Sequence, residues 1–365
     1  MSLACLVRRA TELLLVGLVP LCLSAGVLVM EDGSRGGVAY DFRRAFLPAA
    51  HAVANGRSPF GPATVAALRP GTAFVYPPVA AFVFAPLTWI PPTVAAYVVS
   101  LLVLVCAPAT LWVLGVRDWR CYGASLLWGP VVESVRLGAL SLPLALLVGV
   151  AWRYRDRAAA VGPALAAAIA VKLFLWPLLV WLAATRRLKS AAAVVATAAA
   201  LVVAPWAALG FAGLTAYPHL LRVLSSIEAP ESYTIAAVVS KADGGWRLGE
   251  VATYAAGGLL LAVVVRAARR RQDRRSFFLA LAAALVLSPI VWTHYFALLL
   301  VPVAIMSPTF GPAWLLPAAL FAFPITADSA SWQAIAAALA IVAATVAVSS
   351  GWTRTALPAR TAPSS

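Results

Sequence analysis

Long apolar runs separated by short polar segments make up most of this chain. An α-helix needs about 20 apolar residues to cross a bilayer, and fewer where the surrounding protein shields its ends. The pattern therefore predicts an all-α, polytopic membrane protein of about twelve transmembrane helices. The predicted spans cover residues 13–30, 92–116, 121–133, 140–152, 158–171, 174–185, 190–208, 248–266, 276–288, 294–306, 312–326 and 331–350.

Residues 1–350 are predicted to form a single transmembrane domain, in which polar segments connect the spans. Residues 31–78 form a predicted outer loop after the first span, and residues 210–247 form a second one. The segment 77–90 lies between two Pro-Pro pairs, so we expect a re-entrant or interfacial helix there. The Pro-, Ser- and Thr-rich residues 351–365 are expected to be a disordered cytoplasmic tail.

Composition supports the membrane assignment and argues against nucleic acid as a partner. Of 365 residues, 63% are hydrophobic and only 11% are charged, which is more apolar surface than a soluble domain of this size can bury. The net charge of +15 does not indicate nucleic acid, because the basic residues form short clusters between apolar runs. Placing these clusters inside predicts a cell-membrane protein with both termini in the cytoplasm.

Ionisable residues within membrane sequence are costly and mark candidate functional sites. With this topology, several of them fall on the outer face, and Asp41 in the first outer loop is the foremost candidate. It is followed by Arg43 and Arg44, so helix capping or an ion pair is the structural alternative. A helix from residue 41 to 55 is expected to end at Asn55-Gly56.

Two further cations are candidates for binding a phosphate. Lys172 lies in an apolar run without another charge, and it either binds an anion or extends to the membrane interface from a helix end. Arg136 could act likewise, or pair with Glu133 three residues earlier. His294 follows a helix break at Pro289, which indicates a cavity wall, although its aromatic neighbours also suit an interfacial belt.

Motifs for other chemistries are missing from the sequence. It contains no Gly-rich phosphate loop, HExxH motif, serine nucleophile elbow or paired acidic motif for a nucleotide-sugar metal, and its four cysteines lack metal-site spacing. We therefore expect neither a metal nor a cofactor. A carboxylate with basic and aromatic company suits displacement of a lipid phosphate by an activated hydroxyl.

The order of these motifs resembles that of the integral-membrane glycosyltransferase family 87 (GT87), which is of the GT-C type. The resemblance spans roughly residues 13–305. It rests on the aspartate after the first span, the Gly56–Phe60 turn, the F-x-Y-P-P motif containing Tyr76, the helix ending in Lys172, and S-P-x-x-W-x-H-Y at 288–295.

The resemblance implies an outward-facing α-1,2-mannosyltransferase that uses a polyprenyl-phosphate sugar donor and a glycolipid or envelope glycan acceptor. It implies Asp41 as general base, with Lys172 and His294 near the donor. Tyr76, Arg136, Arg43 and Arg44 are further candidates for substrate binding. The family often has Gly-Gln-x-Asn where Leu137–Leu140 stands here, and Asn-Gln-Ser where Glu231-Ser232-Tyr233 stands, which bears on the acceptor and the sugar. The alternatives are a multi-pass transporter or lipid flippase, and a catalytically degenerate scaffold.

Overall fold

The computed structural model describes residues 11, 13–19, 22, 25–26 and 37–349. The described residues are helical or irregular and contain no strand, which confirms the all-α prediction. Of the predicted first span, residues 13–19, 22 and 25–26 are described, and the predicted tail lies wholly outside the described residues.

The first half of the described chain runs from a short π-helix, η1, to the long helix α12. Its elements are η1 (Leu14–Leu18), η2 (Phe42–Phe46), α3 (Leu47–Ala54), α4 (Val65–Leu68), α5 (Val79–Phe84), η3 (Ala85–Trp89), α6 (Pro92–Val113), α7 (Trp119–Ser125), α8 (Gly129–Leu137), α9 (Ser141–Arg153), α10 (Ala158–Val171), η4 (Leu173–Leu175), α11 (Pro177–Ala184) and α12 (Leu188–Ala208).

The second half contains two further long helices, α15 and α18. Its elements are α13 (Tyr217–Glu228), η5 (Ala229–Glu231), α14 (Ile235–Val239), η6 (Ser240–Gly244), α15 (Trp246–Arg269), α16 (Asp273–Leu287), η7 (Thr293–Leu299), α17 (Leu300–Met306), η8 (Pro312–Trp314), η9 (Leu316–Ala322) and α18 (Trp332–Ser349). The segment 210–247 is thus mostly short helices.

The predicted number of spans is the part of the fold prediction that the structure does not confirm. Among the described residues, four helices are long and apolar enough to cross a membrane: α6, α12, α15 and α18. A fifth span results if α8 and α9 count as one, although they are bent by 116°. Other apolar helices have only 10–17 residues. About twelve spans are therefore not confirmed, because many apolar runs form short or broken helices that pack inside the protein.

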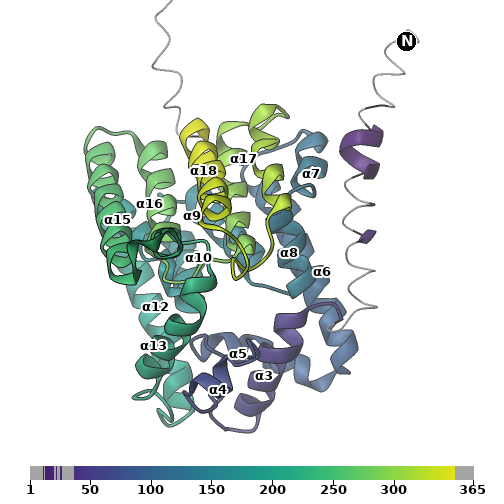
Figure 1. Ribbon diagram of the computed structural model, residues 1–365, viewed down its shortest axis with the longest axis vertical. Helices are drawn as coiled ribbons and strands as arrows, with labels where there is room; N and C mark the ends of the chain where they lie inside the picture. The colour runs from purple at the N-terminus through teal and green to yellow at the C-terminus, as the bar shows by residue number, and fades with distance from the viewer. Residues whose placement is uncertain (1–10, 12, 20–21, 23–24, 27–36, 350–365) are drawn as a thin grey trace, which may run out of the picture.

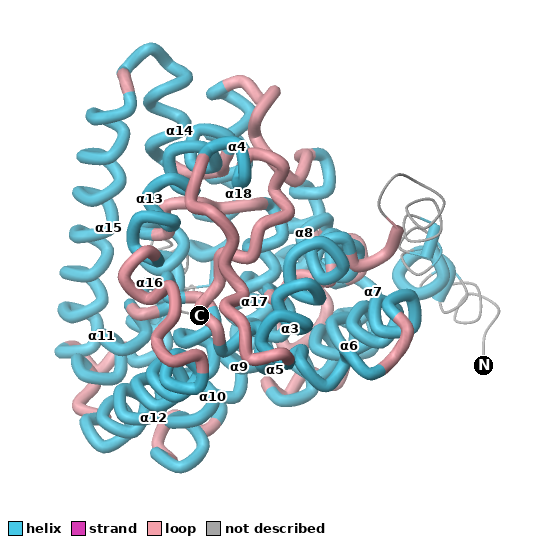
Figure 2. Tube along the Cα trace, turned by 90° about the horizontal axis from the view of Figure 1, so that it is seen from below, coloured by secondary structure: helices cyan, strands magenta, loops and turns pink. Residues whose placement is uncertain are grey.

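The long helices form a bundle that carries a cap of short elements at one end (Figure 1). Helix α10 packs on α12, α15 on α16, and α9 on both α6 and α10. The cap consists of η2, α3, α4, α5 and α13, and Figure 2 shows α3, α4, α5 and α13 when the molecule is seen from that end. The predicted helices at residues 41–55 and 77–90 are both present, in the cap, and the first ends at Asn55 as expected.

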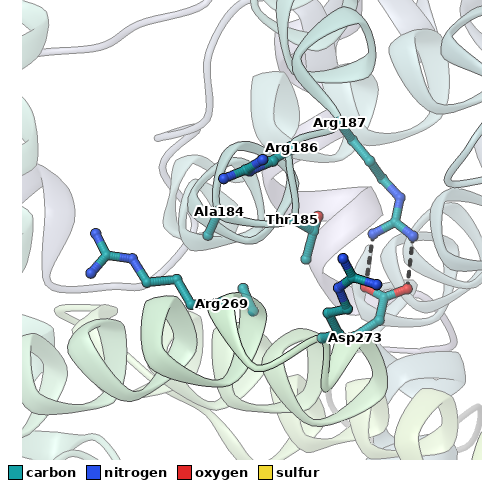
Figure 3. Close-up of a pocket in the computed structure, with 8 residues that line it drawn as sticks. Ala184, Thr185, Arg186, Arg187, Arg269 and Asp273 are labelled. Atoms are coloured by element: carbon teal, nitrogen blue, oxygen red, sulfur yellow. Dashed lines mark hydrogen bonds and ion pairs between the residues drawn. The ribbon is translucent and has the colours of Figure 1, made fainter.

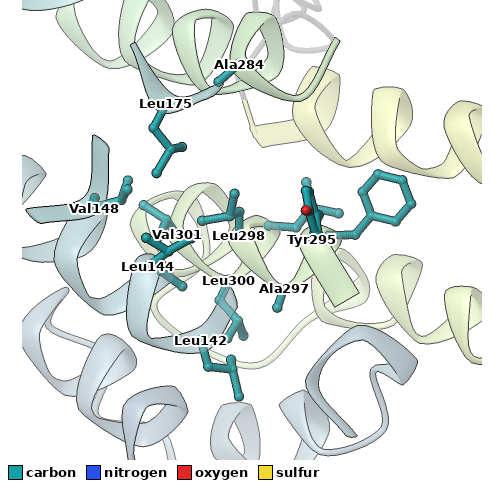
Figure 4. Close-up of a cluster of buried hydrophobic side chains, with 14 of the residues drawn as sticks. Leu142, Leu144, Val148, Leu175, Ala284, Tyr295, Ala297, Leu298, Leu300 and Val301 are labelled. Carbon is teal, nitrogen blue, oxygen red and sulfur yellow. The ribbon is translucent and has the colours of Figure 1, made fainter. Parts of the chain in front are cut away.

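The core is centred on η7 and α17, which pack against α9 and α18, and η7 also packs against α8. Figure 4 shows Leu298 and Val301 of this segment facing Leu144 and Val148 of α9. Every residue from 293 to 304 is buried. Because 3₁₀ runs longer than three or four residues are uncommon, the seven-residue η7 is unusual, and it places the end of the S-P-x-x-W-x-H-Y motif inside the protein.

Candidate active site

A cavity of about 310 Å³ lies between the cap and the bundle. It combines the start of η2, the loop before α5, the junction of α10 and η4, one face of α13, and the segment before η7. The polar side chains and aromatic rings that line it are those of Asp41, Phe46, Tyr76, Lys172, Phe174, Tyr217, Ser225, Glu228, Ser288, Trp292, His294 and Tyr295. Of the residues that the sequence predicts, Asp41, Tyr76, Lys172 and His294 meet here.

The position of Asp41 is set by close contact between the chain before it and the α8–α9 bend. Ala39 has a left-handed backbone (φ 59°), and its N–H donates to the Arg136 carbonyl at 2.8 Å. Gly138, also left-handed (φ 65°), lies so close that an added Cβ would be 2.9 Å from the Ala39 Cβ. Such strain persists only where the surrounding structure enforces it. On the C-terminal side of Asp41, the chain is fixed by Phe42, which packs on Phe84 with ring centroids 5.3 Å apart.

The Asp41 carboxylate makes neither of the structural interactions that the sequence left open. It precedes η2 without a side-chain capping bond. Within the described part of the chain it forms no ion pair with Arg43 or Arg44. Burial raises the pKa of Asp41 from 3.8 to about 6, and the nearby charges of Lys172 and Arg136 oppose this rise. A carboxylate with a pKa close to physiological pH is well suited to general base catalysis.

Lys172 lies at the break between α10 and η4, where the backbone becomes extended (φ −135°, ψ 100°). Its side chain is only 7% exposed and therefore does not extend to the interface. The ammonium donates to the Tyr295 hydroxyl and lies 3.7 Å from the Tyr295 ring centroid and 5.2 Å from that of Tyr76. The aromatic faces thus hold a cation at the cavity wall.

His294 is buried, with 3% of its surface exposed, and it lines the cavity. Its Nδ1 has no hydrogen-bond partner among the described residues. Since buried polar atoms normally have partners, this nitrogen is available to a ligand. Trp292 and Tyr295 also line the cavity, so the segment is a cavity wall and not an interfacial belt.

The three predicted arginines do not line this cavity. Arg136 pairs with Glu133 at 2.6 Å, and its charge acts on Asp41 from outside the cavity. Arg43 lies against Gly37. Arg44 is exposed, with its guanidinium 6.0 Å from the centroid of the Tyr40 ring, and it lines a separate hollow on the cap.

Sequence reasoning missed Glu228 as a cavity residue. It lies on the face of α13 that also presents Tyr217, Leu221, Leu224 and Ser225 to the cavity, at the three- and four-residue spacing of one helix face. Burial raises the pKa of Glu228 to about 7, with contributions from the charges of Glu231 and Asp41. The amphipathic pattern of residues 217–228 was the signal that could have placed it.

The cavity therefore combines two carboxylates of raised pKa, an ammonium, an unpaired imidazole nitrogen and several aromatic rings. It can accept a proton from a hydroxyl at Asp41 and hold an anion at Lys172. Aromatic faces beside polar groups suit a ligand that is partly apolar. Among the described residues, no three His, Cys, Asp or Glu side chains are grouped as metal ligands would be.

Comparison with known proteins gives one match. The family model of glycosyltransferase family 87 matches residues 74–302. This stretch contains Tyr76, Lys172, Glu228 and His294, whereas Asp41 lies before it and joins them only in space. Neither a curated protein nor a solved structure matches the chain.

Proposed function

The chain belongs to glycosyltransferase family 87, and on that premise we propose that it moves a sugar, mannose, from a polyprenyl-phosphate donor to a lipid-linked or envelope glycan acceptor. A glycosyltransferase has a sugar donor and an acceptor, and this one works in a membrane. The observation that carries the proposal is that Asp41, Lys172 and His294, distant in sequence, line one cavity.

In the proposed reaction, a hydroxyl of the acceptor attacks the anomeric carbon of the sugar. The hydroxyl proton passes to the Asp41 carboxylate while the new carbon–oxygen bond forms. The bond between the anomeric carbon and the phosphate oxygen breaks, and both of its electrons leave with the polyprenyl phosphate. A single displacement of this kind inverts the anomeric centre, and it requires one base.

The surrounding groups of the cavity support this arrangement. Lys172 is proposed to stabilise the charge that develops on the departing phosphate, because a cation in a poorly solvated site acts strongly on such charge. His294 and Tyr76 are proposed to bind the donor headgroup, for which the unpaired Nδ1 of His294 is available. Arg136, Arg43 and Arg44 lie outside the cavity, so we assign them to the positive field that attracts the anionic donor.

The apolar part of the cavity suits the proposed lipid donor. Leu173 of η4 lines the cavity and is also half exposed at the protein surface, and Leu221 and Leu224 of α13 line the cavity as well. An isoprenoid chain could therefore reach from the bilayer to the cavity along apolar side chains. We propose that the site faces the outside of the cell membrane, where the termini would lie in the cytoplasm.

Sugar transfer in membranes tests the proposal directly. Membranes that contain the parent protein, Asp41→Asn or Asp243→Asn are given radiolabelled polyprenyl-phosphomannose and a short mannoside acceptor. Asp243 is an exposed residue with a left-handed backbone (φ 62°), which Asn tolerates well, so it controls for the same chemical change elsewhere.

Transfer by the parent and by Asp243→Asn, with loss in Asp41→Asn at equal expression, is the expected result. Equal transfer by all three proteins would remove Asp41 from the chemistry. If the parent transfers no mannose from this donor but transfers a sugar from another polyprenyl-phosphate donor, the assignment of mannose is overturned. The assignment of the active site would still stand.

A further inference from the structure

A second cavity, of about 540 Å³, lies at the end of the bundle opposite the cap. It opens between the turn that follows α11 and the turn that follows α15, as Figure 3 shows. Helix α16 begins at Asp273 in this cavity and ends just before Ser288 in the candidate active site. Its 15 residues separate the two cavities by about 22 Å, at 1.5 Å per residue.

Four arginines and a single carboxylate, Asp273, line this cavity. Arg187 is held in place by Asp273, through two bonds of 2.8 Å, and by Asp156 at 2.7 Å. Arg186, Arg269 and Arg271 are exposed, and within the described part of the chain no ion pair or hydrogen bond neutralises their side chains. The cavity thus has a strong excess of positive charge beside a guanidinium that is already oriented.

The backbone presents two of these arginines in an unusual way. Both helices end in the same C-terminal motif, in which the residue after the cap is left-handed: Arg186 (φ 62°) after α11 and Arg271 (φ 57°) after α15. The bonds from Arg187 N–H to the Leu182 carbonyl and from Gln272 N–H to the Ala267 carbonyl complete the two motifs. Glycine is the favoured residue at this position. Two adjacent turns therefore carry a guanidinium where the backbone alone would favour glycine.

The neighbouring surface is apolar. Leu188, the first residue of α12, is 65% exposed immediately after the Arg186-Arg187 turn. Of the most apolar stretches of α12 and α15, only 11% and 22% of the residues are buried in the protein. Such surface suits acyl chains, and basic pockets between membrane helices suit phosphate headgroups. A phosphate source in the bilayer is therefore favoured over one in solution.

We propose that this basic cavity, formed by Arg186, Arg187, Arg269 and Arg271, binds the phosphate headgroup of an anionic phospholipid. The acyl chains lie along the exposed apolar faces of α12 and α15. Because the cavity is separated from the candidate active site by the length of α16, the bound lipid is a separate ligand and not the sugar donor. The proposal does not depend on the proposed sugar transfer.

Two glycine substitutions test the effect of the arginine charges without disturbing the backbone conformation of the turns. In Arg186→Gly and Arg271→Gly the left-handed turns are retained or favoured, while the cations are lost. The matched control is Arg270→Gln, because Arg270 is exposed beside the same cavity but does not line it. Delipidated full-length protein in detergent is titrated with phosphatidylglycerol or phosphatidylcholine, and bound lipid is counted by native mass spectrometry.

The parent is expected to bind phosphatidylglycerol in preference to phosphatidylcholine. Each glycine substitution is expected to weaken phosphatidylglycerol binding by about fivefold, and the pair by about 25-fold, from the interaction of one cation with an anionic lipid surface. The Arg270→Gln control is expected to bind as the parent does. Unchanged binding in the double variant, or an equal loss in the control, would overturn the proposal.

A second arm distinguishes the source of the phosphate. Thermal unfolding of the parent is measured with inorganic phosphate and with phosphatidylglycerol at the same total phosphate concentration. Stabilisation by the lipid alone, lost in the double glycine variant, supports a headgroup site. Equal stabilisation by inorganic phosphate would overturn the lipid as its source.

Discussion

Asp41→Asn is expected to remove sugar transfer and at the same time to stabilise the folded protein. The reason is that the cavity desolvates the Asp41 carboxylate without giving it a hydrogen bond or ion pair within the described residues. An ionised group in such surroundings is costly to the fold, and it persists only if function requires it. Asn has nearly the same shape and no charge.

The size of the stability change follows from the pKa of Asp41. The difference between 3.8 and about 6 corresponds to at most about 3 kcal/mol, at 1.36 kcal/mol per pH unit. Because the pKa of the folded state is the higher one, the carboxyl imposes no cost below pH 3.8, where it is protonated in both states. The cost develops as the pH rises from about 3.8 to about 6 and is complete above that range.

Thermal unfolding of the parent and Asp41→Asn between pH 4 and 8 measures this change. The Asn variant is expected to unfold at a higher temperature at pH 7.5, and the difference is expected to vanish towards pH 4. Asp243→Asn should show no such difference, because the Asp243 side chain is exposed. In parallel, transfer by Asp41→Asn is expected to fall by about 10²- to 10⁴-fold, the usual contribution of a general base.

A lower unfolding temperature for Asp41→Asn at pH 7.5, together with lost activity, would refute this reasoning. The carboxylate would then be an acceptor that holds the cap in place, and its loss would reduce activity indirectly. The transfer rate of the parent should also fall tenfold per pH unit below about pH 6, as the base becomes protonated. A flat profile through this range would count against Asp41 as the base.

Three further changes test the groups around Asp41. Lys172→Gln is expected to raise the donor KM and to move the acidic limb of the pH–rate profile to higher pH, since the charge of Lys172 lowers the pKa of Asp41. Arg136→Gln should move the limb likewise but raise the donor KM less than Lys172→Gln does, because Arg136 acts from outside the cavity, and an equal KM effect would place Arg136 at the donor. Glu228 ionises at about pH 7 and then adds a negative charge that opposes binding of an anionic donor. The donor KM of the parent should therefore rise above that pH, whereas the donor KM of Glu228→Gln should stay constant. The same rise in both proteins would exclude Glu228 as its cause. Gly138→Ala places a Cβ on a left-handed residue, against the chain before Asp41. It is expected to lower the free energy of unfolding by about 1–3 kcal/mol, as followed by thermal unfolding, and to reduce transfer. A variant as stable as the parent would show that the α8–α9 bend tolerates a side chain.

The membrane class and the all-helical fold were determined by the sequence alone. Apolar surface on this scale can be solvated only by lipid or buried in a large core, and backbone groups in lipid require helices or closed barrels. Local sequence was also sufficient to predict the helix that ends at Asn55-Gly56 and the short helix between the proline pairs. The conformational preferences of glycine, asparagine and proline act over only a few residues, so no tertiary contact is needed to predict these ends.

The span count and the identity of the cavity-lining groups were decided by tertiary structure. An apolar run of 12–15 residues has the same composition whether it crosses a membrane or packs on η7, so hydropathy alone does not determine the number of spans. Likewise, Arg43 and Arg44 are two and three residues from Asp41 in sequence, yet neither of them lines the cavity. Lys172, Glu228 and His294 join Asp41 only because helix breaks and the α13 face converge on it, and convergence in space leaves no periodicity in a single sequence.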